Sequence, residues 1–118
     1  MGPRGRAYYY KLEGMVPVPC SWYEAGVLMA DYNGRCVEHT VLKSGHRIST
    51  AFLVFDHNLM GPGDPILWNT IVTDRNGKER IYGKYRSLIQ AKIGHKAAVA
   101  VIGLLERNEE KDGSEGGN

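Results

Sequence analysis

The chain has 118 residues, which is the size of one domain and long enough to bury a core of its own. Its 42% apolar and 24% charged residues lie near globular averages and exclude a disordered chain, and a net charge of +2 does not by itself indicate a polyanionic partner. No uninterrupted apolar run approaches the roughly 18 residues of a membrane helix, and the N-terminus lacks the apolar segment of a secretory signal. We therefore expect a cytoplasmic protein with no membrane partner.

The composition changes at both ends of the chain. Residues 1–6 (MGPRGR) are expected to form a flexible arm, and residues 108–118 (NEEKDGSEGGN) an acidic, flexible tail. A single α+β domain is expected between them, at residues 7–107. Cys20 and Cys36 are the only cysteines, and we expect both to be reduced, partly buried thiols.

The N-terminal part predicts a strand followed by a short helix. Aromatic residues at 7–12 favour a strand, and the Val-Pro-Val-Pro sequence at 16–19 favours a stiff, extended connector. Ser21 and Glu24 form the pattern of a capping box, which predicts a helix over residues 22–32.

A β-hairpin is predicted next. Apolar residues alternate over 37–41 and 48–54 on either side of a turn at Ser44-Gly45. With these two residues at the centre of the turn, Val41 lies opposite Ile48 and the hairpin has one largely apolar face. This face is expected to meet the helices.

Two further strands are predicted at residues 66–73 and 78–82, joined by a type I′ turn at Asn76-Gly77. Ser87 is a candidate cap for a long helix at residues 88–107. The predicted fold is therefore α+β: an antiparallel, four- to five-stranded meander sheet, with the short N-terminal helix and the long C-terminal helix packed on one face.

The long helix carries more apolar surface than one face of a small sheet can bury, so a homodimer through this helix is expected. His95, on its apolar side, is expected to make a buried hydrogen bond to the sheet. The candidate interface residues recur at spacings of three and four: Leu88, Ala91, His95, Ala98, Ile102 and Leu105. A second row widens this apolar stripe: Ile89, Ile93, Ala97, Val101 and Leu104.

The loop between the predicted central strands, residues 56–64, is the most polar and glycine-rich stretch with candidate ligands: Asp56, His57, Asn58 and Asp64. His57 could act as a general base beside a carboxylate, or the group could bind a metal or small ligand. The alternative is that Asp56 and Asn58 satisfy turn amides and the loop only shapes the bend. No catalytic motif is present, so we expect no catalytic residues, no metal site and no cofactor.

A basic set follows the loop and could face the phosphates of a nucleic acid: Arg75, Lys78, Arg80, Lys84 and Arg86. Strand alternation would place Lys78, Arg80 and Lys84 on one strand face, with Tyr82 and Tyr85 available to stack on bases. The alternative is an edge strand that its charges protect from pairing with other chains.

Three stretches resemble a family of small uncharacterised bacteriophage and prophage proteins: YYYKLEG with VPVPC, ISTAFLVFDHNLMGPGDPILWNTIV, and ERIYGKYRSLIQAKIGHKAAV. Members of that family have a strand ending in Asp-His, a glycine-rich loop, a strand containing Glu-Thr and a later Ala-x-x-Gly-His helix. This chain differs at Asn69-Thr70, where the family usually has Glu-Thr. The resemblance implies a viral or prophage accessory protein that works in the bacterial cytoplasm.

The sequence and the resemblance together favour a non-enzymatic accessory protein that binds a host macromolecule. The expected partner is a host protein or nucleoprotein complex, such as a defence or nucleic-acid-processing complex that this protein would inhibit, with nucleic acid itself as an alternative partner. Two other functions are open: a small-ligand or metal-binding protein that uses the 56–64 loop, and a structural or virion-associated oligomer.

Overall fold

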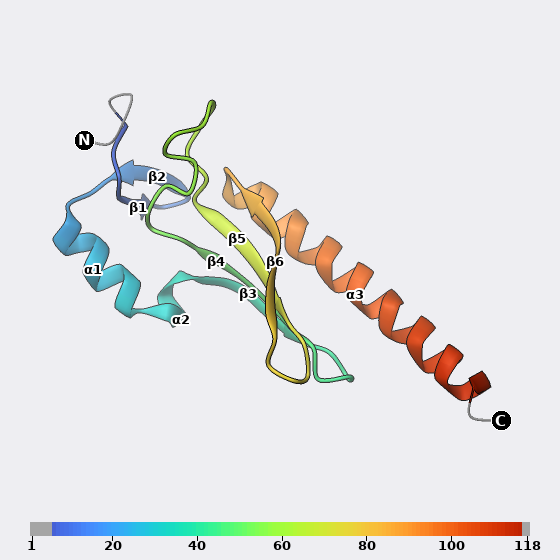
Figure 1. Ribbon diagram of the computed structural model, residues 1–118. Helices are drawn as coiled ribbons and strands as arrows, with labels where there is room; N and C mark the ends of the chain where they lie inside the picture. Colours follow the sequence, from blue (N-terminus) through green and yellow to red (C-terminus); the bar gives the residue numbers. More distant parts are fainter. Residues whose placement is uncertain (1–5, 117–118) are drawn as a thin grey trace.

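The computed structural model describes residues 6–116, with side chains described as far as Arg107. Residues 1–5 of the expected arm at 1–6, and the last two residues of the expected tail, lie outside this range. Nine helices and strands follow one another in the described part (Figure 1): β1 (Tyr10–Glu13), β2 (Val16–Pro19), α1 (Trp22–Ala30), α2 (Tyr32–Arg35), β3 (Cys36–Val41), β4 (Arg47–Phe52), β5 (Trp68–Thr73), β6 (Glu79–Tyr85) and α3 (Leu88–Gly116).

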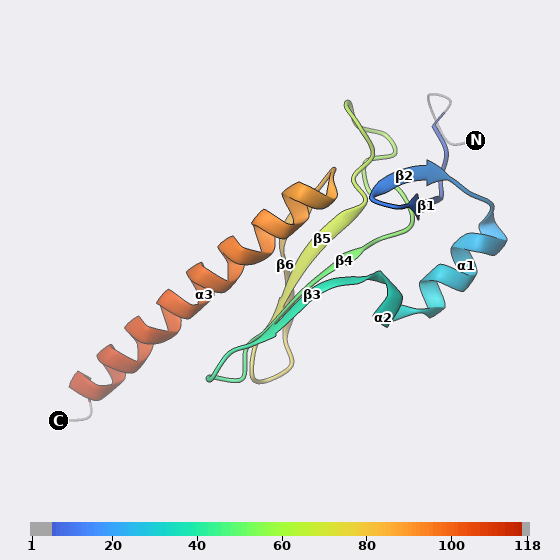
Figure 2. The same cartoon turned by 180° about the vertical axis from the view of Figure 1, so that it is seen from behind.

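The main sheet is an antiparallel meander with the strand order β3-β4-β5-β6, and α3 packs along one face of it (Figures 1 and 2). The predicted α+β class, the meander and the packing of the long helix are confirmed. The short helix α1 contacts β1 and packs on the same core cluster as Ala91 of α3. Its single buried residue, Ala25, joins a core cluster with Tyr10 and Phe52.

The N-terminal hairpin forms a separate two-stranded sheet. The Val-Pro-Val-Pro segment, expected as a connector, is strand β2 and pairs with β1, with Leu12 opposite Pro17. Proline lacks a backbone donor but is tolerated in a strand whose other edge is unpaired. The capping box is confirmed, because the Ser21 side chain accepts from Glu24 N–H and the Glu24 carboxylate accepts from Ser21 N–H, both at 3.1 Å.

The β3–β4 hairpin has a register one residue away from the predicted one: Thr40, not Val41, lies opposite Ile48. A backbone hydrogen bond closes a loop of three residues, 43–45, in which the glycine has φ +95°. A one-residue slip exchanges the two faces of a strand. His39 therefore lies on the sheet face away from α3, opposite Ser49.

The predicted hairpin at Asp74–Gly77 forms, but its turn is also longer than expected. Residues 75–77 make the loop, and Gly77 has φ +86°, a left-handed conformation that favours glycine. The Asp74 carboxylate accepts the backbone N–H groups of Asn76 and Lys78 at 2.9 Å each, which stabilises this turn.

Helix α3 begins as predicted, with the Ser87 hydroxyl accepting from Gln90 N–H at 3.1 Å. It runs to Gly116, so its backbone continues as a helix through residues 108–116, part of the stretch expected as a flexible tail. The glutamates and lysine at 109–111 are good helix formers, and extending an existing helix does not repeat the cost of nucleation.

A polar network lies between α3 and the sheet. The fully buried His95 ring hydrogen-bonds Thr40 Oγ1 and Thr50 Oγ1, both at 2.8 Å. Thr50 in turn contacts Thr70 Oγ1 at 2.6 Å, and the Tyr85 hydroxyl donates to the same oxygen at 3.0 Å. The predicted buried hydrogen bond of His95 to the sheet is confirmed, and it holds α3 in one position on the strands.

Candidate functional site

The 56–64 loop leaves the sheet through a strained residue. Val54 has φ +73°, a conformation that is rare for a β-branched residue, and its side chain is fully buried. Its carbonyl accepts from Tyr10 N–H at 2.7 Å. The surrounding packing therefore holds the chain in a bend that turns Asp56 inward.

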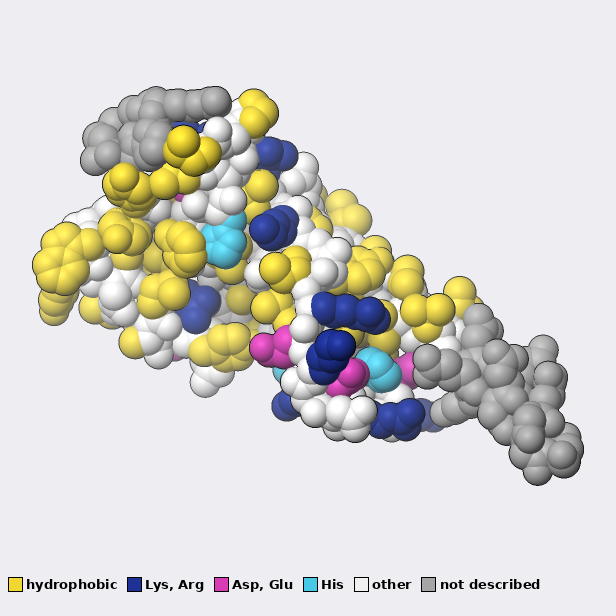
Figure 3. All heavy atoms as spheres, viewed as in Figure 1, with side chains coloured by type: hydrophobic (Ala, Val, Ile, Leu, Met, Phe, Trp, Pro, Cys, Tyr) yellow, Lys and Arg dark blue, Asp and Glu magenta, His cyan; other side chains and the backbone are white. Residues whose placement is uncertain are grey.

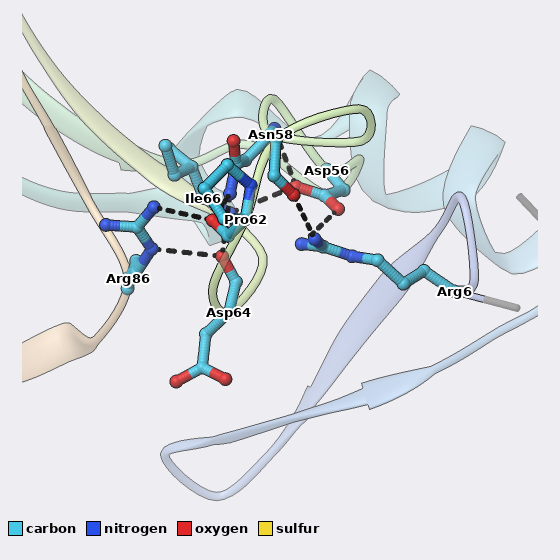
Figure 4. Close-up of polar contacts among 8 residues, drawn as sticks. Arg6, Asp56, Asn58, Pro62, Asp64, Ile66 and Arg86 are labelled. Carbon is cyan, nitrogen blue, oxygen red and sulfur yellow. Dashed lines mark hydrogen bonds and ion pairs between the residues drawn. The ribbon is translucent and has the colours of Figure 1, made fainter. Parts of the chain in front are cut away.

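Asp56 is buried and used by the fold. One carboxylate oxygen accepts from Asn58 N–H at 2.7 Å and Ile66 N–H at 3.0 Å, and the other pairs with the Arg6 guanidinium at 2.7 Å (Figure 4). Arg6 also donates to the Gly61 carbonyl at 3.1 Å. Arg6, expected as part of a flexible arm, thus joins the N-terminal segment to the loop.

Asn58 and Arg86 hold the loop from its other side. Asn58 Nδ2 donates to Pro62 O at 2.7 Å and to Asp64 O at 3.3 Å, and Arg86 Nε donates to the same Asp64 carbonyl at 3.0 Å. Figure 4 shows the Asp64 carboxylate pointing away from these contacts. Asp64 therefore contributes its carbonyl oxygen to the loop, and its side chain stays in solvent.

The surroundings of His57 favour its neutral imidazole form. Burial lowers the pKa of His57, the nearby Lys84 charge lowers it further, and Asp56 opposes the change. Its Nε2 atom is buried without a hydrogen-bond partner among the described residues, and its ring lies 4.4 Å from that of Phe55. No group of three His, Cys, Asp or Glu side chains in the described part of the chain could hold a metal ion. The arrangement favours a shaped connection over a base with an orienting carboxylate.

The basic residues do not gather on one surface. Arg80 pairs with Val72, which is buried on the α3 side of the sheet, whereas Lys84 pairs with Asn69 on the other face. The prediction that Lys78, Arg80 and Lys84 share one strand face is wrong, because a β-bulge at Tyr82 reverses the alternation of side chains along β6. The other basic residues are dispersed. Arg75 and Lys78 lie at the turn between β5 and β6, and Arg86 hydrogen-bonds the 56–64 loop.

The candidate interface residues on α3 lie mostly against the chain's own sheet. Ala91, His95, Ala98 and Ile102 are buried there, Leu88 is half-buried, and Leu105 is exposed. A second copy of the chain cannot contact these buried side chains while α3 stays on the sheet.

The structure exposes an apolar surface that is not among the candidate sites predicted from the sequence. The α1 patch, defined as Trp22, Tyr23, Val27 and Met29, lies on the surface, with Trp22 75% and Tyr23 70% exposed. Figure 3 shows apolar side chains gathered over this end of the molecule. The signal was present in the sequence, because helix α1 (WYEAGVLMA) contains only one charged residue and so has no polar face to turn to solvent.

A groove of about 480 Å³ runs beside the α1 patch. Its apolar walls include Leu12, Val27 and Phe52, from β1, α1 and β4. The Lys11–Glu24 ion pair, 3.2 Å long, and the Arg35 guanidinium are its charged groups. This size and lining are typical of a site that takes apolar side chains or a small apolar ligand.

A second, more polar groove of about 460 Å³ lies on the sheet face that α3 leaves open, and its lining includes Tyr32, His39, Arg47 and Asn69. The Tyr32 hydroxyl hydrogen-bonds Ser49 there. This contact ties the one-turn helix α2 to the sheet and closes one side of the groove.

Within the described residues, the stretch Leu88–Arg107 of α3 is long and apolar enough to cross a membrane, judged by length and composition alone. Lys92 and Lys96 interrupt it, which is why no continuous apolar run stands out in the sequence. A core helix can pass the same test, and α3 is bonded to the sheet through His95.

Comparisons of the chain with protein-family models, with curated proteins and with solved structures found no match. The resemblance to phage and prophage proteins therefore stays a prediction.

Proposed function

We propose that this protein is a non-enzymatic binding protein that docks on another protein through the α1 patch. The observation that carries the proposal is the exposure of Trp22 and Tyr23 in the first turn of a capped helix. Tryptophan, tyrosine and methionine are enriched where protein interfaces are buried, and a few such residues commonly supply most of the binding energy.

The patch is held in a fixed position, which favours binding without a large ordering cost. Arg35 donates to Leu28 O at 3.0 Å, to Met29 O at 3.3 Å and to Phe52 O at 3.0 Å, so it joins the C-terminal end of α1 to β4. The capping box holds the other end of the helix. Both ends of α1 are thus fastened while its apolar side chains remain free.

A host protein in the bacterial cytoplasm, such as part of a defence or nucleic-acid-processing complex, is the partner that the resemblance suggests. A protein partner is favoured over nucleic acid because the basic residues are dispersed over both sheet faces and Arg86 is committed to the loop. A small-ligand site at the 56–64 loop is not favoured, since Asp56 and Asn58 are bonded within the protein.

The test is affinity capture from bacterial lysate with quantitative mass spectrometry, comparing the wild type with Trp22→Ala/Val27→Glu. We expect a specific protein to be captured by the wild type and to be reduced at least tenfold with the variant. The matched control is Val41→Glu, which changes another exposed apolar residue on β3. Equal capture by the wild type and the α1-patch variant, with both folded by circular dichroism, would rule out this surface.

A further inference from the structure

Helix α3 has two apolar sides, and only one of them is covered. Ala91, Ala98 and Ile102 are buried against the sheet. The opposite side is exposed, with Ile89 at 68%, Ile93 at 63% and Leu104 at 52%. We define the outer row as the exposed residues Ile89, Ile93, Ala97, Ala100, Val101 and Leu104. A helix that is apolar on both sides is typical of one that is covered on both sides.

The spacing of the outer row fits another helix. Ile93, Ala97, Ala100 and Leu104 follow intervals of four, three and four, which is the repeat of the seam between paired helices. In an antiparallel pair related by a twofold axis, Ile93 of one copy meets Leu104 of the other, and Ala97 meets Ala100. Large residues then pack at the ends and small ones at the centre, where the helix axes approach closely.

We propose that the outer row of α3 is a self-association surface, covered by the α3 helix of a second copy of this chain. The row contains no charged residue, and Lys92 and Lys96 lie to one side of it, where their ammonium groups reach water. Pairing therefore removes apolar surface from water without burying a charge.

A second copy explains the outer row better than a lipid bilayer does. To span a membrane, α3 would have to leave the sheet and break the hydrogen bonds of His95 to Thr40 and Thr50. A helix that lies on a membrane surface usually carries bulky aromatic or leucine residues on its apolar face. The centre of the outer row is instead Ala97 and Ala100, which suit close packing of two helices.

The size of the surface sets the expected strength. From Ile89 to Leu104 the row is about 22 Å long, at the 1.5 Å rise of an α-helix. Contact along one short helix falls below the roughly 800 Å² per partner of a standard stable interface. The dimer should therefore dissociate on dilution, with a dissociation constant on the order of micromolar.

The dimer has a consequence that rests on the proposed function. Helices α1 and α3 lie on opposite sides of the molecule in both views (Figures 1 and 2). Pairing through α3 leaves both α1 patches exposed, so the dimer would present two docking surfaces and gain avidity for a partner with two sites. The dimer itself is tested on the purified chain alone, so its failure and a failure of partner capture are separate results.

The experiment is sedimentation velocity on the full chain over a dilution series through the micromolar range. We expect a monomer–dimer equilibrium for the wild type, and at least a tenfold higher dissociation constant for Ile93→Glu/Leu104→Glu. Ile93→Gln/Leu104→Gln repeats the test without added charge, and circular dichroism checks that each variant is folded. The control Ile81→Glu, at an exposed apolar position on β6, should dimerise like the wild type.

Three results would overturn the proposal. The first is a wild-type monomer at all concentrations. The second is a dimer that both outer-row variants leave unchanged. The third concerns lipid: a monomeric wild type that floats with phosphatidylglycerol–phosphatidylethanolamine vesicles, and loses this binding in Ile93→Gln/Leu104→Gln, would assign the row to a membrane surface.

Discussion

Gly94 offers a direct test of how α3 packs on the sheet. A Cβ atom at this position would collide with the ring of Tyr85 on β6. The Tyr85 hydroxyl donates to Thr70 Oγ1 at 3.0 Å, and its ring also lies against Gly83. The ring therefore cannot move aside without giving up its hydrogen bond. We predict that Gly94→Ala destabilises the protein although alanine is the better helix former.

The expected magnitude comes from three opposing effects. Overpacking a filled contact costs about 1–3 kcal/mol, and losing the hydrogen bond of Tyr85 costs about 1 kcal/mol. Replacing a helical glycine by alanine returns about 1 kcal/mol. The net loss for Gly94→Ala should thus be about 1–3 kcal/mol.

Gly103 provides the matched control in the same helix. A Cβ atom at Gly103 would lie 3.7 Å from Arg107 Nη1, an ordinary contact. Gly103→Ala should therefore stabilise the protein by about 0.5–1 kcal/mol. Urea denaturation followed by circular dichroism measures both variants. Equal stability of Gly94→Ala and Gly103→Ala would refute the close packing of Tyr85 on α3.

Two further predictions concern buried ionisable groups. Burial lowers the pKa of His95 below its usual 6.5, so the unfolded chain binds a proton at this residue more readily than the folded chain does. The free energy of unfolding should therefore fall as the pH drops below 6.5. Urea titrations at several pH values should show a smaller fall in stability for His95→Gln than for the wild type. Asp56→Asn leaves the Arg6 guanidinium without its carboxylate. Since the Arg6 side chain is 15% exposed, we expect a loss of about 2–3 kcal/mol, somewhat less than for a fully buried pair. The control is Asp64→Asn, at an exposed carboxylate, which should change the free energy of unfolding by less than about 0.5 kcal/mol. Thermal denaturation measures both variants. Similar curves for Asp56→Asn and Asp64→Asn would contradict a structural role for Asp56.

The local features of the fold were readable from the sequence because each depends on neighbouring residues. Ser21 with Glu24, and Ser87 before the long helix, are caps that act within one helical turn. Alternating apolar residues and turn glycines predicted the four meander strands, and the wide apolar stripe predicted α3. The buried hydrogen bond of His95 followed from its place on that stripe.

The register and the faces of the strands depended on single residues in turns and bulges. The β3–β4 and β5–β6 loops each contain three residues rather than two, a difference that the Ser44-Gly45 and Asn76-Gly77 pairs do not reveal. The bulge at Tyr82 then separates Arg80 from Lys84. Because strand side chains alternate with a period of two, one extra residue moves every later side chain to the other face.

The sequence by itself determined the class of fold, the helix caps, the meander order and the excess of apolar surface on the long helix. Only the tertiary structure decided that Asp56 pairs with Arg6, far away in the chain, and that Trp22 and the outer row of α3 remain uncovered. The physical reason is that burial depends on the area that other elements provide. One four-stranded sheet can cover a single side of α3, and Ala25 is the one residue of α1 that is buried in the core.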